Sequence, residues 1–574
     1  MHNLCFCRLL LPVHFLCTCL LAPLSLSAGK IVPMPVQRNT SPTSRTLITV
    51  YYLLITALLV SCAPANVTPV VFPSYDPFLP LQKETQTQPD LTGTSSPLPN
   101  TPTPTPTRQS TPTRPPLNIS LVISGLTNKI INTPTPDTAR ILPTPRQNVD
   151  EYMVQPGDSL GGIAQRFGIS VQTLMEANKI SDPNLLDVGV VLKVPAPKPV
   201  NAGTSLKIIP DSELVYGPAS VYFDIGDFIK SQNGYLSPYT QEVNGVLLTG
   251  EEIILLVAQN YSVNPRLLLA LIEYQSGWVT NPTPYNTSYP LGLADENRID
   301  LYRQLTWTAD TLNRGYYLWK ANALSTWVLN DGQVIPIDPT INAGTAAVQY
   351  FFSQLDDLLG WERDVNVKGL ILTYYVFFGN PFNYAIEPLL APDLSQPALT
   401  LPFKKGEAWY FTGGPHGGWG SGSAWAALDF APPGENSNCM ASDFWVTAIA
   451  SGLVIRASNG ALIQDLDNDG YEQTGWVVLY MHIAEEERAQ PDEYLFAGEQ
   501  IGHPSCEGGL SNATHVHLAR KYNGEWIAAD GSTPFNLDGW ISSGSGGEYN
   551  GFLTRGAQTI EAWDSANDFN LITR

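Results

Sequence analysis

Histidine is scarce and unevenly distributed in this chain of 574 residues. There are seven histidines, and none lies between His14 and His416. Five fall near the C-terminus, at positions 416, 482, 503, 515 and 517. Histidine is the commonest metal ligand and the usual proton carrier near neutral pH, so its absence from the middle of the chain confines the expected chemistry to the last domain.

Positive charge is also in short supply. Lysine and arginine together number 31 against 52 acidic residues, which gives a formal net charge of −21. Because no basic stripe is present to neutralise phosphates, we expect no nucleic-acid partner. Bulk attraction cannot drive binding to any anionic polymer either, so recognition of such a partner has to come from local pockets. A chain of 574 residues is too long to fold around a single hydrophobic core, so several domains are expected.

Cysteine is almost absent after residue 62, where only Cys439 and Cys506 occur. The two cysteines flank the segment that contains His482. A disulfide between them is expected in an exported protein, and two buried free thiols are the alternative.

Residues 1–62 are predicted to be an export region. The apolar stretch 46–61 follows Arg38 and Arg45 and ends at Cys62. Its charged and apolar parts fit an export signal, and it is short for a membrane span. Leu59-Val-Ser-Cys62 resembles a bacterial lipobox, which implies lipidation of Cys62 and attachment to the outer face of a membrane. A start at Met34 and a retained membrane anchor are left open.

Residues 63–150 are predicted to be a disordered linker rich in proline and threonine. Thr-Pro repeats fill the stretch from Pro97 to Pro116. Repeated proline favours an extended conformation, which is typical of a semi-rigid spacer.

Residues 151–196 show the pattern of a strand, two helices and a second strand. Tyr152-Met-Val-Gln-Pro-Gly-Asp-Ser-Leu opens the segment, and Leu192-Lys-Val-Pro closes it. The segment resembles a LysM domain, a β-α-α-β fold that binds N-acetylglucosamine polymers. A spacer with the same fold and little affinity is the alternative. The resemblance implies two glycan-binding loops, which contain Gly157, Asp158, Ser159, Leu160, Pro183, Asn184 and Leu185.

The middle of the chain divides into two parts. Residues 197–245 are predicted to be a linker or a small irregular segment, without an assigned function. Residues 246–400 are predicted to be mainly helical, with one helix that starts at Pro265 and ends before Gly277.

The helical part resembles the lysozyme-like fold of lytic transglycosylases, whose catalytic glutamate falls at Gln275 here. An amide cannot protonate a glycosidic oxygen. Glu273 cannot replace it, because two residues along a helix turn the side chain by about 200°. We therefore expect a degenerate lysozyme-like domain that holds glycan without cutting it.

The pattern of a metal site lies in residues 401–574. His515-Val-His517 is an H-x-H pair in a β-prone setting, and residues i and i+2 of a strand project from one face. His416 lies in a glycine-rich stretch, and Asp429 follows in Ala-Leu-Asp-Phe-Ala-Pro. A His/Asp/His set can hold zinc and leave the fourth position for water, which is typical of a catalytic site.

These motifs resemble the lysostaphin-type zinc endopeptidases, especially the LytM-like staphylolysin branch with its long His…Asp spacing. Further landmarks are Tyr480-Met-His482 and Gly498-Glu-Gln-Ile-Gly502. The resemblance implies a mainly antiparallel β domain with one zinc ion, and it supports the disulfide. The implied zinc ligands are His416, Asp429 and His517, and the implied catalytic residues are His482 and His515. His503 has no counterpart and is expected to be structural.

The sequence contains no His-Glu-x-x-His helix, so no glutamate base is expected. We predict that His515 takes the proton of the attacking water. His482 is predicted to hydrogen-bond the developing oxyanion or to protonate the leaving amine.

A second cation is compatible with Asp465-Leu-Asp467-Asn-Asp469-Gly. These aspartates stand at positions 1, 3 and 5 of a calcium-loop pattern, but Trp476 replaces the glutamate expected at position 12. A bound Ca²⁺ and a tight turn between two strands both remain open.

Together, these features predict a multidomain, exported and lipid-anchored peptidoglycan hydrolase of the cell envelope. The LysM domain would grip glycan, and the zinc domain would cleave peptide cross-links or stem peptides. The staphylolysin resemblance suggests glycyl bonds. The alternatives are a non-catalytic peptidoglycan-binding regulator on a dead peptidase fold, and a lytic transglycosylase acting through the middle domain. The oligomeric state is left open.

Overall fold

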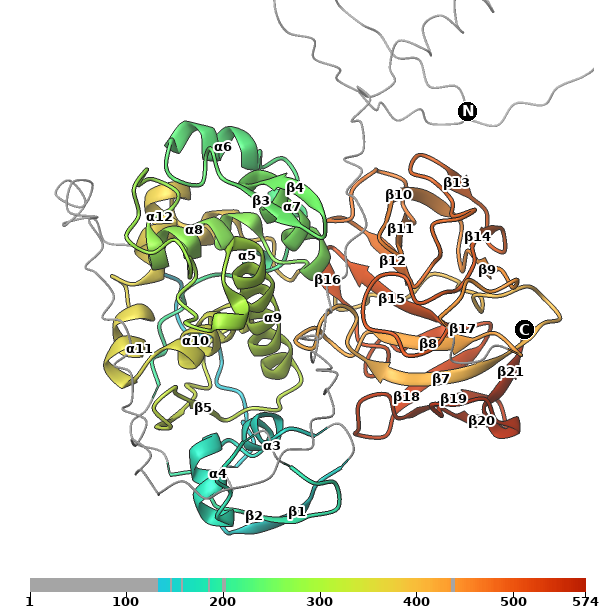
Figure 1. The fold of residues 1–574 in the computed structure, drawn as a ribbon, viewed down its shortest axis with the longest axis horizontal. Coiled ribbons are helices and arrows are strands. Elements are labelled where there is room, and N and C mark those ends of the chain that lie inside the picture. The colour runs from blue at the N-terminus through green and yellow to red at the C-terminus, as the bar shows by residue number, and fades with distance from the viewer. Residues whose placement is uncertain (1–132, 145–146, 156–157, 184–185, 199–202, 435–438) are drawn as a thin grey trace, which may run out of the picture. The chain divides into compact units, whose positions relative to one another are not determined.

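The computed structural model describes residues 133–144, 147–155, 158–183, 186–198, 203–434 and 439–574 (Figure 1). The predicted export region with Cys62, most of the predicted linker, and Gly157, Asn184 and Leu185 lie outside the described residues. Across the described ranges, no helix combines the length and apolarity needed to cross a membrane. The end of the predicted linker packs on the helical region, because Asp137 N donates to Thr340 O at 2.9 Å.

Residues 150–194 form a β-α-α-β module. Strand β1 (Asp150–Met153) pairs antiparallel with β2 (Val191–Val194), and α3 (Leu160–Arg166) and α4 (Val171–Asn178) lie between them in sequence. Side-chain oxygens start both helices, because Ser159 accepts from Gly162 N and Ser170 accepts from Thr173 N. The helices close over a small apolar core of Leu160, Ile163, Ala164, Leu174, Leu192 and Val194.

The middle region is mainly helical and begins earlier than expected. The segment 197–245 was predicted to be a linker or a small irregular segment. From residue 203 onward it is part of the helical core, because apolar residues such as Leu214, Ile229 and Leu236 are buried there. The elements are α5 (Asp211–Leu214), η2 (Pro218–Ser220), α6 (Ile225–Gln232), β3 (Thr240–Val243), β4 (Val246–Thr249), α7 (Gly250–Tyr261), α8 (Pro265–Ser276), η3 (Glu296–Arg298), α9 (Leu301–Lys320), β5 (Thr326–Val328), β6 (Val334–Pro336), α10 (Ala343–Leu355), α11 (Leu358–Asp364), α12 (Leu370–Phe378) and η4 (Pro381–Tyr384).

Helix α8 is buried along most of its length. It starts at Pro265 and is closed by Gly277 at φ 71°. Glu273 on this helix is buried and accepts hydrogen bonds from Val279 N, Thr280 N and the Thr280 hydroxyl at 3.1, 3.0 and 2.6 Å. Its carboxylate therefore serves the turn after α8 and is not free to act on a glycan.

The C-terminal region is built on a nine-stranded antiparallel sheet, in which β16 pairs with β15 outside the main order. The main order is β13 (Tyr494–Leu495), β10 (Gly452–Ser458), β11 (Ala461–Asp465), β12 (Trp476–Met481), β15 (Val516–Tyr522), β8 (Ala427–Ala431), β7 (Ala408–His416) and β21 (Leu571–Thr573). The other strands are β16 (Glu525–Trp526), the pair β9 (Val446–Thr447) and β14 (Gln500–Gly502), and the sheet of β17 (Asn536–Leu537), β18 (Trp540–Gly544), β19 (Gly551–Arg555) and β20 (Gln558–Glu561), followed in sequence by η5 (Asp568–Asn570).

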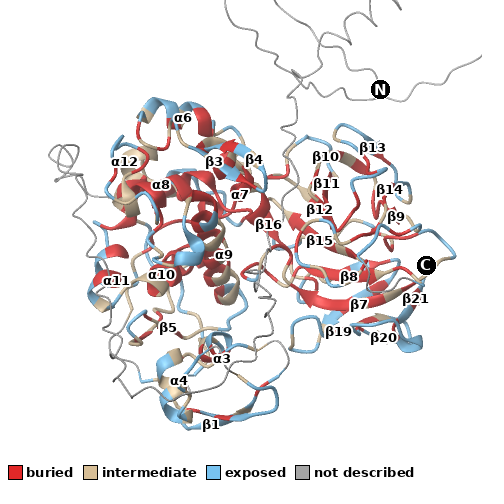
Figure 2. Cartoon of the chain, viewed as in Figure 1, coloured by how far each residue is buried: buried red, intermediate tan, exposed pale blue. Residues whose placement is uncertain are grey.

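The two faces of the large sheet belong to different cores, and its central strands are mostly buried (Figure 2). Because strand residues alternate between faces, Leu428, Val478 and Leu518 join the core of the C-terminal region. Leu479 and Ala519 point to the other face and join the core of the helical region. His517 is two residues from Ala519 on β15, and Asp429 is its direct partner on β8, so both project from the same face as Ala519. The candidate site therefore opens on this second face.

Candidate metal centre

Strand register brings two of the predicted ligands together. His517 on β15 is the direct partner of Asp429 on β8, and β7 adds Gly413 opposite Asp429. Nδ1 of His517 lies 3.3 Å from Oδ1 of Asp429. A Cβ at Gly413 would lie 2.5 Å from Oδ2 of Asp429, so only glycine leaves room for this carboxylate.

His416 completes the set from the end of β7. Two irregularities in the β7–β8 pairing, around Gly413 and before His416, turn the end of the strand. Nε2 of His416 then lies 2.9 Å from Nδ1 of His517 and 3.3 Å from Oδ1 of Asp429. Potential ligand atoms of the three residues all lie within 4.8 Å of one another.

The hydrogen bonds of the two imidazoles leave lone pairs facing each other. His416 Nδ1 donates to Gly414 O at 2.8 Å, and His517 Nε2 donates to Gly418 O at 3.1 Å. In the neutral tautomers, His416 Nε2 and His517 Nδ1 are therefore both acceptors. Oδ1 of Asp429 is buried beside them without a hydrogen-bond partner. One proton cannot satisfy three acceptors, whereas a divalent cation can, and two imidazoles with a carboxylate suit zinc.

Electrostatics keep the Asp429 carboxylate ionised. Burial raises its pKa, but His416 and His515 together hold that pKa well below the usual range. Burial lowers the pKa of both ligand imidazoles. The charge of Asp429 outweighs this at His416, whose pKa is raised, but not at His517, whose pKa is lowered.

His482 and His515 reach the site from the same end of the β12–β15 pair, since His482 directly follows β12 and His515 directly precedes β15. His482 follows β12 directly and has φ 66°, a left-handed conformation that non-glycine residues rarely adopt. Its Nδ1 donates to Glu507 O at 3.0 Å. Nδ1 of His515 donates to Ala513 O at 2.8 Å, and the two ring centroids are 4.5 Å apart. Each neutral ring therefore presents Nε2 as an acceptor.

Burial, followed by the neighbouring imidazoles of His515 and His517, holds the pKa of His482 well below its usual range. His482 is therefore neutral near pH 7. A hydrogen-bond donor role at Nε2, as predicted for the oxyanion, would require a protonation that this environment opposes. The geometry favours an acceptor role.

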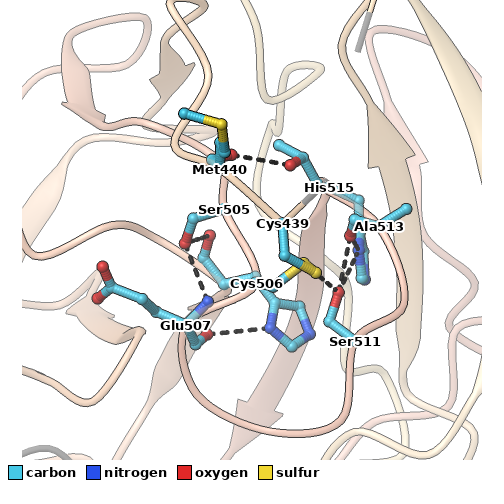
Figure 3. Close-up of a disulfide and its surroundings, with 10 residues drawn as sticks. Cys439, Met440, Ser505, Cys506, Glu507, Ser511, Ala513 and His515 are labelled. Carbon is cyan, nitrogen blue, oxygen red and sulfur yellow. Dashed lines mark hydrogen bonds between the residues drawn. A yellow bond between two sulfur atoms is a disulfide. The ribbon is translucent and has the colours of Figure 1, made fainter. Parts of the chain in front are cut away.

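A disulfide joins Cys439 to Cys506 and anchors the segment that holds both histidines (Figure 3). Ser505 next to it donates from N and Oγ to His482 O at 2.6 and 3.0 Å. The Ser511 hydroxyl donates to Ala513 O at 2.7 Å, and it lies 3.2 Å from the Cys506 sulfur and 3.3 Å from Nδ1 of His515. Residues 505–513 thus form a continuous support behind the two rings.

No motif pointed to Tyr549, yet its ring stacks on His416 with centroids 4.2 Å apart. It lies in the glycine-rich connection between β18 and β19 and is held by Gly414 N, which donates to Tyr549 O at 2.8 Å. Burial raises the pKa of its hydroxyl, which therefore stays protonated. The only signal in the sequence is an aromatic residue within Ser-Gly-Gly-Glu-Tyr-Asn-Gly.

A cavity of about 1010 Å³ opens onto the site. His416, His482, His517 and Tyr549 contribute one wall, and α9 of the helical region contributes to the other wall with Arg303, Thr306, Trp307 and Asp310. These four positions recur at the spacing of one helix face. His503 is not part of this lining; its Nδ1 donates to Phe444 O at 2.9 Å, and its Nε2 lies 3.0 Å from the Glu487 carboxylate.

The three aspartates of the calcium-loop pattern also lie close enough to share an ion. Asp465 accepts from Asp467 N and Gly470 N at 3.0 and 2.9 Å, and Asp469 accepts from the Thr474 hydroxyl at 2.6 Å. These bonds are those of a tight turn. Burial and then Asp467 raise the pKa of Asp465 to about 7. Calcium binding stays a prediction.

The described residues of the predicted glycan loops have local structural contacts. Asp158 accepts from the Tyr152 hydroxyl and from Gln155 N at 2.7 and 2.8 Å, Ser159 caps α3, and Leu160 is buried. Pro183 is exposed. Because the side chains of Asp158, Ser159 and Leu160 are engaged, glycan contacts at the first loop would have to come mainly from the backbone.

Comparisons with known proteins agree with this organisation. Residues 152–195 match the family model of the LysM domain, and residues 207–391 match that of the LasA N-terminal domain. The lysozyme-like fold of the middle region stays a prediction. Protease LasA of Pseudomonas aeruginosa is 24% identical over 304 residues, covering 48% of this chain and 68% of that protein.

Two further relatives cover smaller parts. N-acetylmuramoyl-L-alanine amidase XlyA of Bacillus subtilis is 54% identical over 46 residues, 8% of this chain and 16% of that protein. The deep-sea M23 metalloprotease pseudoalterin is 21% identical with a TM-score of 0.24, covering 29% of this chain and 97% of its own. The chain is thus similar to protease LasA over about half of its length, and it contains a LysM domain.

Proposed function

We propose that this protein is a zinc-dependent endopeptidase that cleaves peptide cross-links or stem peptides of peptidoglycan. The observation that carries the proposal is the convergence of His416, Asp429 and His517 with their lone pairs facing one point. The similarity to protease LasA supports peptidase activity. The LysM domain and the similarity to an N-acetylmuramoyl-L-alanine amidase support a wall polymer as the target.

A zinc ion held by these three residues would lower the pKa of a coordinated water to about 7 and polarise the scissile carbonyl. His515 is suited to take a proton, because its Nδ1–H is used by Ala513 O and Nε2 faces the site, 3.8 Å from Oδ1 of Asp429. His482 presents a second acceptor nitrogen. The protonated hydroxyl of Tyr549 is available as a donor in the same cavity.

The other domains would keep the peptidase at its substrate. A LysM domain that binds glycan raises the effective concentration of the peptidase at the wall without a tighter active site. We also propose export, supported by the Cys439–Cys506 disulfide, because disulfides persist in oxidising compartments. Lipidation at Cys62 would add a membrane anchor.

One digestion of purified peptidoglycan separates the candidate functions. Wild type, His515→Ala and Gln275→Glu proteins are compared. New free amines that disappear with His515→Ala support the endopeptidase. Reducing or unsaturated sugar ends would instead indicate glycosidase chemistry, and the absence of any product would indicate a non-catalytic regulator.

A further inference from the structure

Helix α9 of the helical region holds the loop that connects two of the proposed zinc ligands. This loop, residues 417–423, follows His416 and leads to the strand of Asp429. Asp310 on α9 accepts from Gly422 N at 2.8 Å and from the Ser421 hydroxyl at 2.9 Å. One turn further along, Arg314 donates to Ser421 O at 3.1 Å and to Ser421 Oγ at 2.8 Å.

The glycines of the loop fit it to α9. Gly420 has φ 68°, and a Cβ there would lie 2.5 Å from Oδ1 of Asp310 and 3.0 Å from the ring of Tyr261. A Cβ at Gly422 would lie 1.9 Å from the backbone oxygen of Asp310. The loop between His416 and Asp429 thus contains the residues that contact the helical region.

The same loop orients a proposed ligand. Gly418 O accepts the Nε2 proton of His517, which leaves Nδ1 free for a metal. Gly418 packs against Trp526, since a Cβ at this position would lie 2.8 Å from that ring. A continuous path of contacts therefore leads from Asp310 through Ser421 and the loop to the imidazole of His517.

We propose that Asp310 and Arg314 are positioning residues for the metal centre. The helical region would thus contribute to zinc binding by the C-terminal region. The inference rests on the proposed function. Partners that orient a ligand typically change metal affinity by about 10- to 100-fold when they are removed. Asp310 acts on His517 only through the loop, so we expect a loss at the lower end of this range, about tenfold.

The test measures the zinc dissociation constant of the full chain by competition with a chromogenic chelator. Asp310→Ala and Ser421→Ala should each weaken zinc binding about tenfold, and the visible spectrum of the Co²⁺-substituted proteins should change. Because both substitutions break the contact between Asp310 and Ser421, the double variant should lose less affinity than the product of the two single losses. The matched control is Asp227→Ala, an exposed aspartate on α6, which should bind zinc like wild type.

The inference would be overturned if Asp310→Ala and Ser421→Ala both had the zinc affinity and the Co²⁺ spectrum of the wild type. Ser421→Ala leaves α9 unchanged, so it decides the matter if Asp310→Ala does not fold. A wild-type protein that binds no zinc would refute the proposed function itself. A zinc-binding wild type with unaffected variants would refute only the role of α9.

Discussion

His517 lies directly opposite Asp429 in the antiparallel pairing of β15 with β8, and Nδ1 of His517 is 3.3 Å from Oδ1 of Asp429. Directly opposed residues of neighbouring strands project on the same side of a sheet. The backbone register therefore brings an imidazole and a carboxylate together before any metal is considered.

Replacing either member of this pair should remove the metal. We expect His517→Ala and Asp429→Ala to lose bound zinc and peptidase activity, since the two remaining protein ligands would bind zinc too weakly to retain it. Elemental analysis after dialysis measures the zinc. His503→Ala is the matched control and should keep one equivalent, and a His517→Ala protein that also keeps one equivalent would contradict the ligand set.

Replacing His515 should separate metal binding from catalysis. His515→Ala should keep zinc and lower kcat by about 10²- to 10⁴-fold, the usual contribution of a proton-transfer group. Zinc content and peptide hydrolysis are measured on the same preparation. A variant that loses its zinc would assign His515 to the metal instead.

Breaking the disulfide should loosen the support of both catalytic histidines. In the Cys439→Ser/Cys506→Ser double variant we expect the free energy of unfolding to fall by about 2–5 kcal/mol, and activity to fall while zinc is retained. Denaturant unfolding and peptide hydrolysis measure the two effects. The control is a reducing agent, which should inhibit wild type but leave the double variant unchanged.

Stability should depend on acid pH through Glu472. This buried carboxylate lies 3.1 Å from Arg456 and 2.9 Å from Lys521. Burial raises the pKa of Glu472, but the two cations lower it by more, so that the net pKa falls from 4.5 to about 2. A depressed pKa in the folded state stabilises the protein above about pH 4.5, and this contribution disappears as pH falls toward 2.

The measurement is the free energy of unfolding of wild type and Glu472→Gln as a function of pH. The variant should be less stable at pH 7, and the difference should shrink between pH 4.5 and 2. A difference that does not change with pH would show that the charge of Glu472 contributes nothing.

The local patterns were sufficient to predict the LysM module and the residues proposed for the metal site. The Tyr152–Pro195 pattern is contiguous, and His515-Val-His517 needs only the alternation of one strand. The segment 197–245 was predicted to be a linker or a small irregular segment, whereas from residue 203 onward its short elements pack into the helical core. Helices α5 and α6 have only four and eight residues, too few for a hydrophobic period to identify them reliably.

The sequence by itself determined which side chains can bind a metal or carry a proton, since that depends on residue type and short spacing. Only the tertiary structure decided which ring nitrogens face one another, that Tyr549 covers His416, and that α9 holds the loop before Asp429. Those relationships join positions such as Asp310 and Gly422, which are 112 residues apart. They depend on strand register and on packing between distant segments, which no local pattern contains.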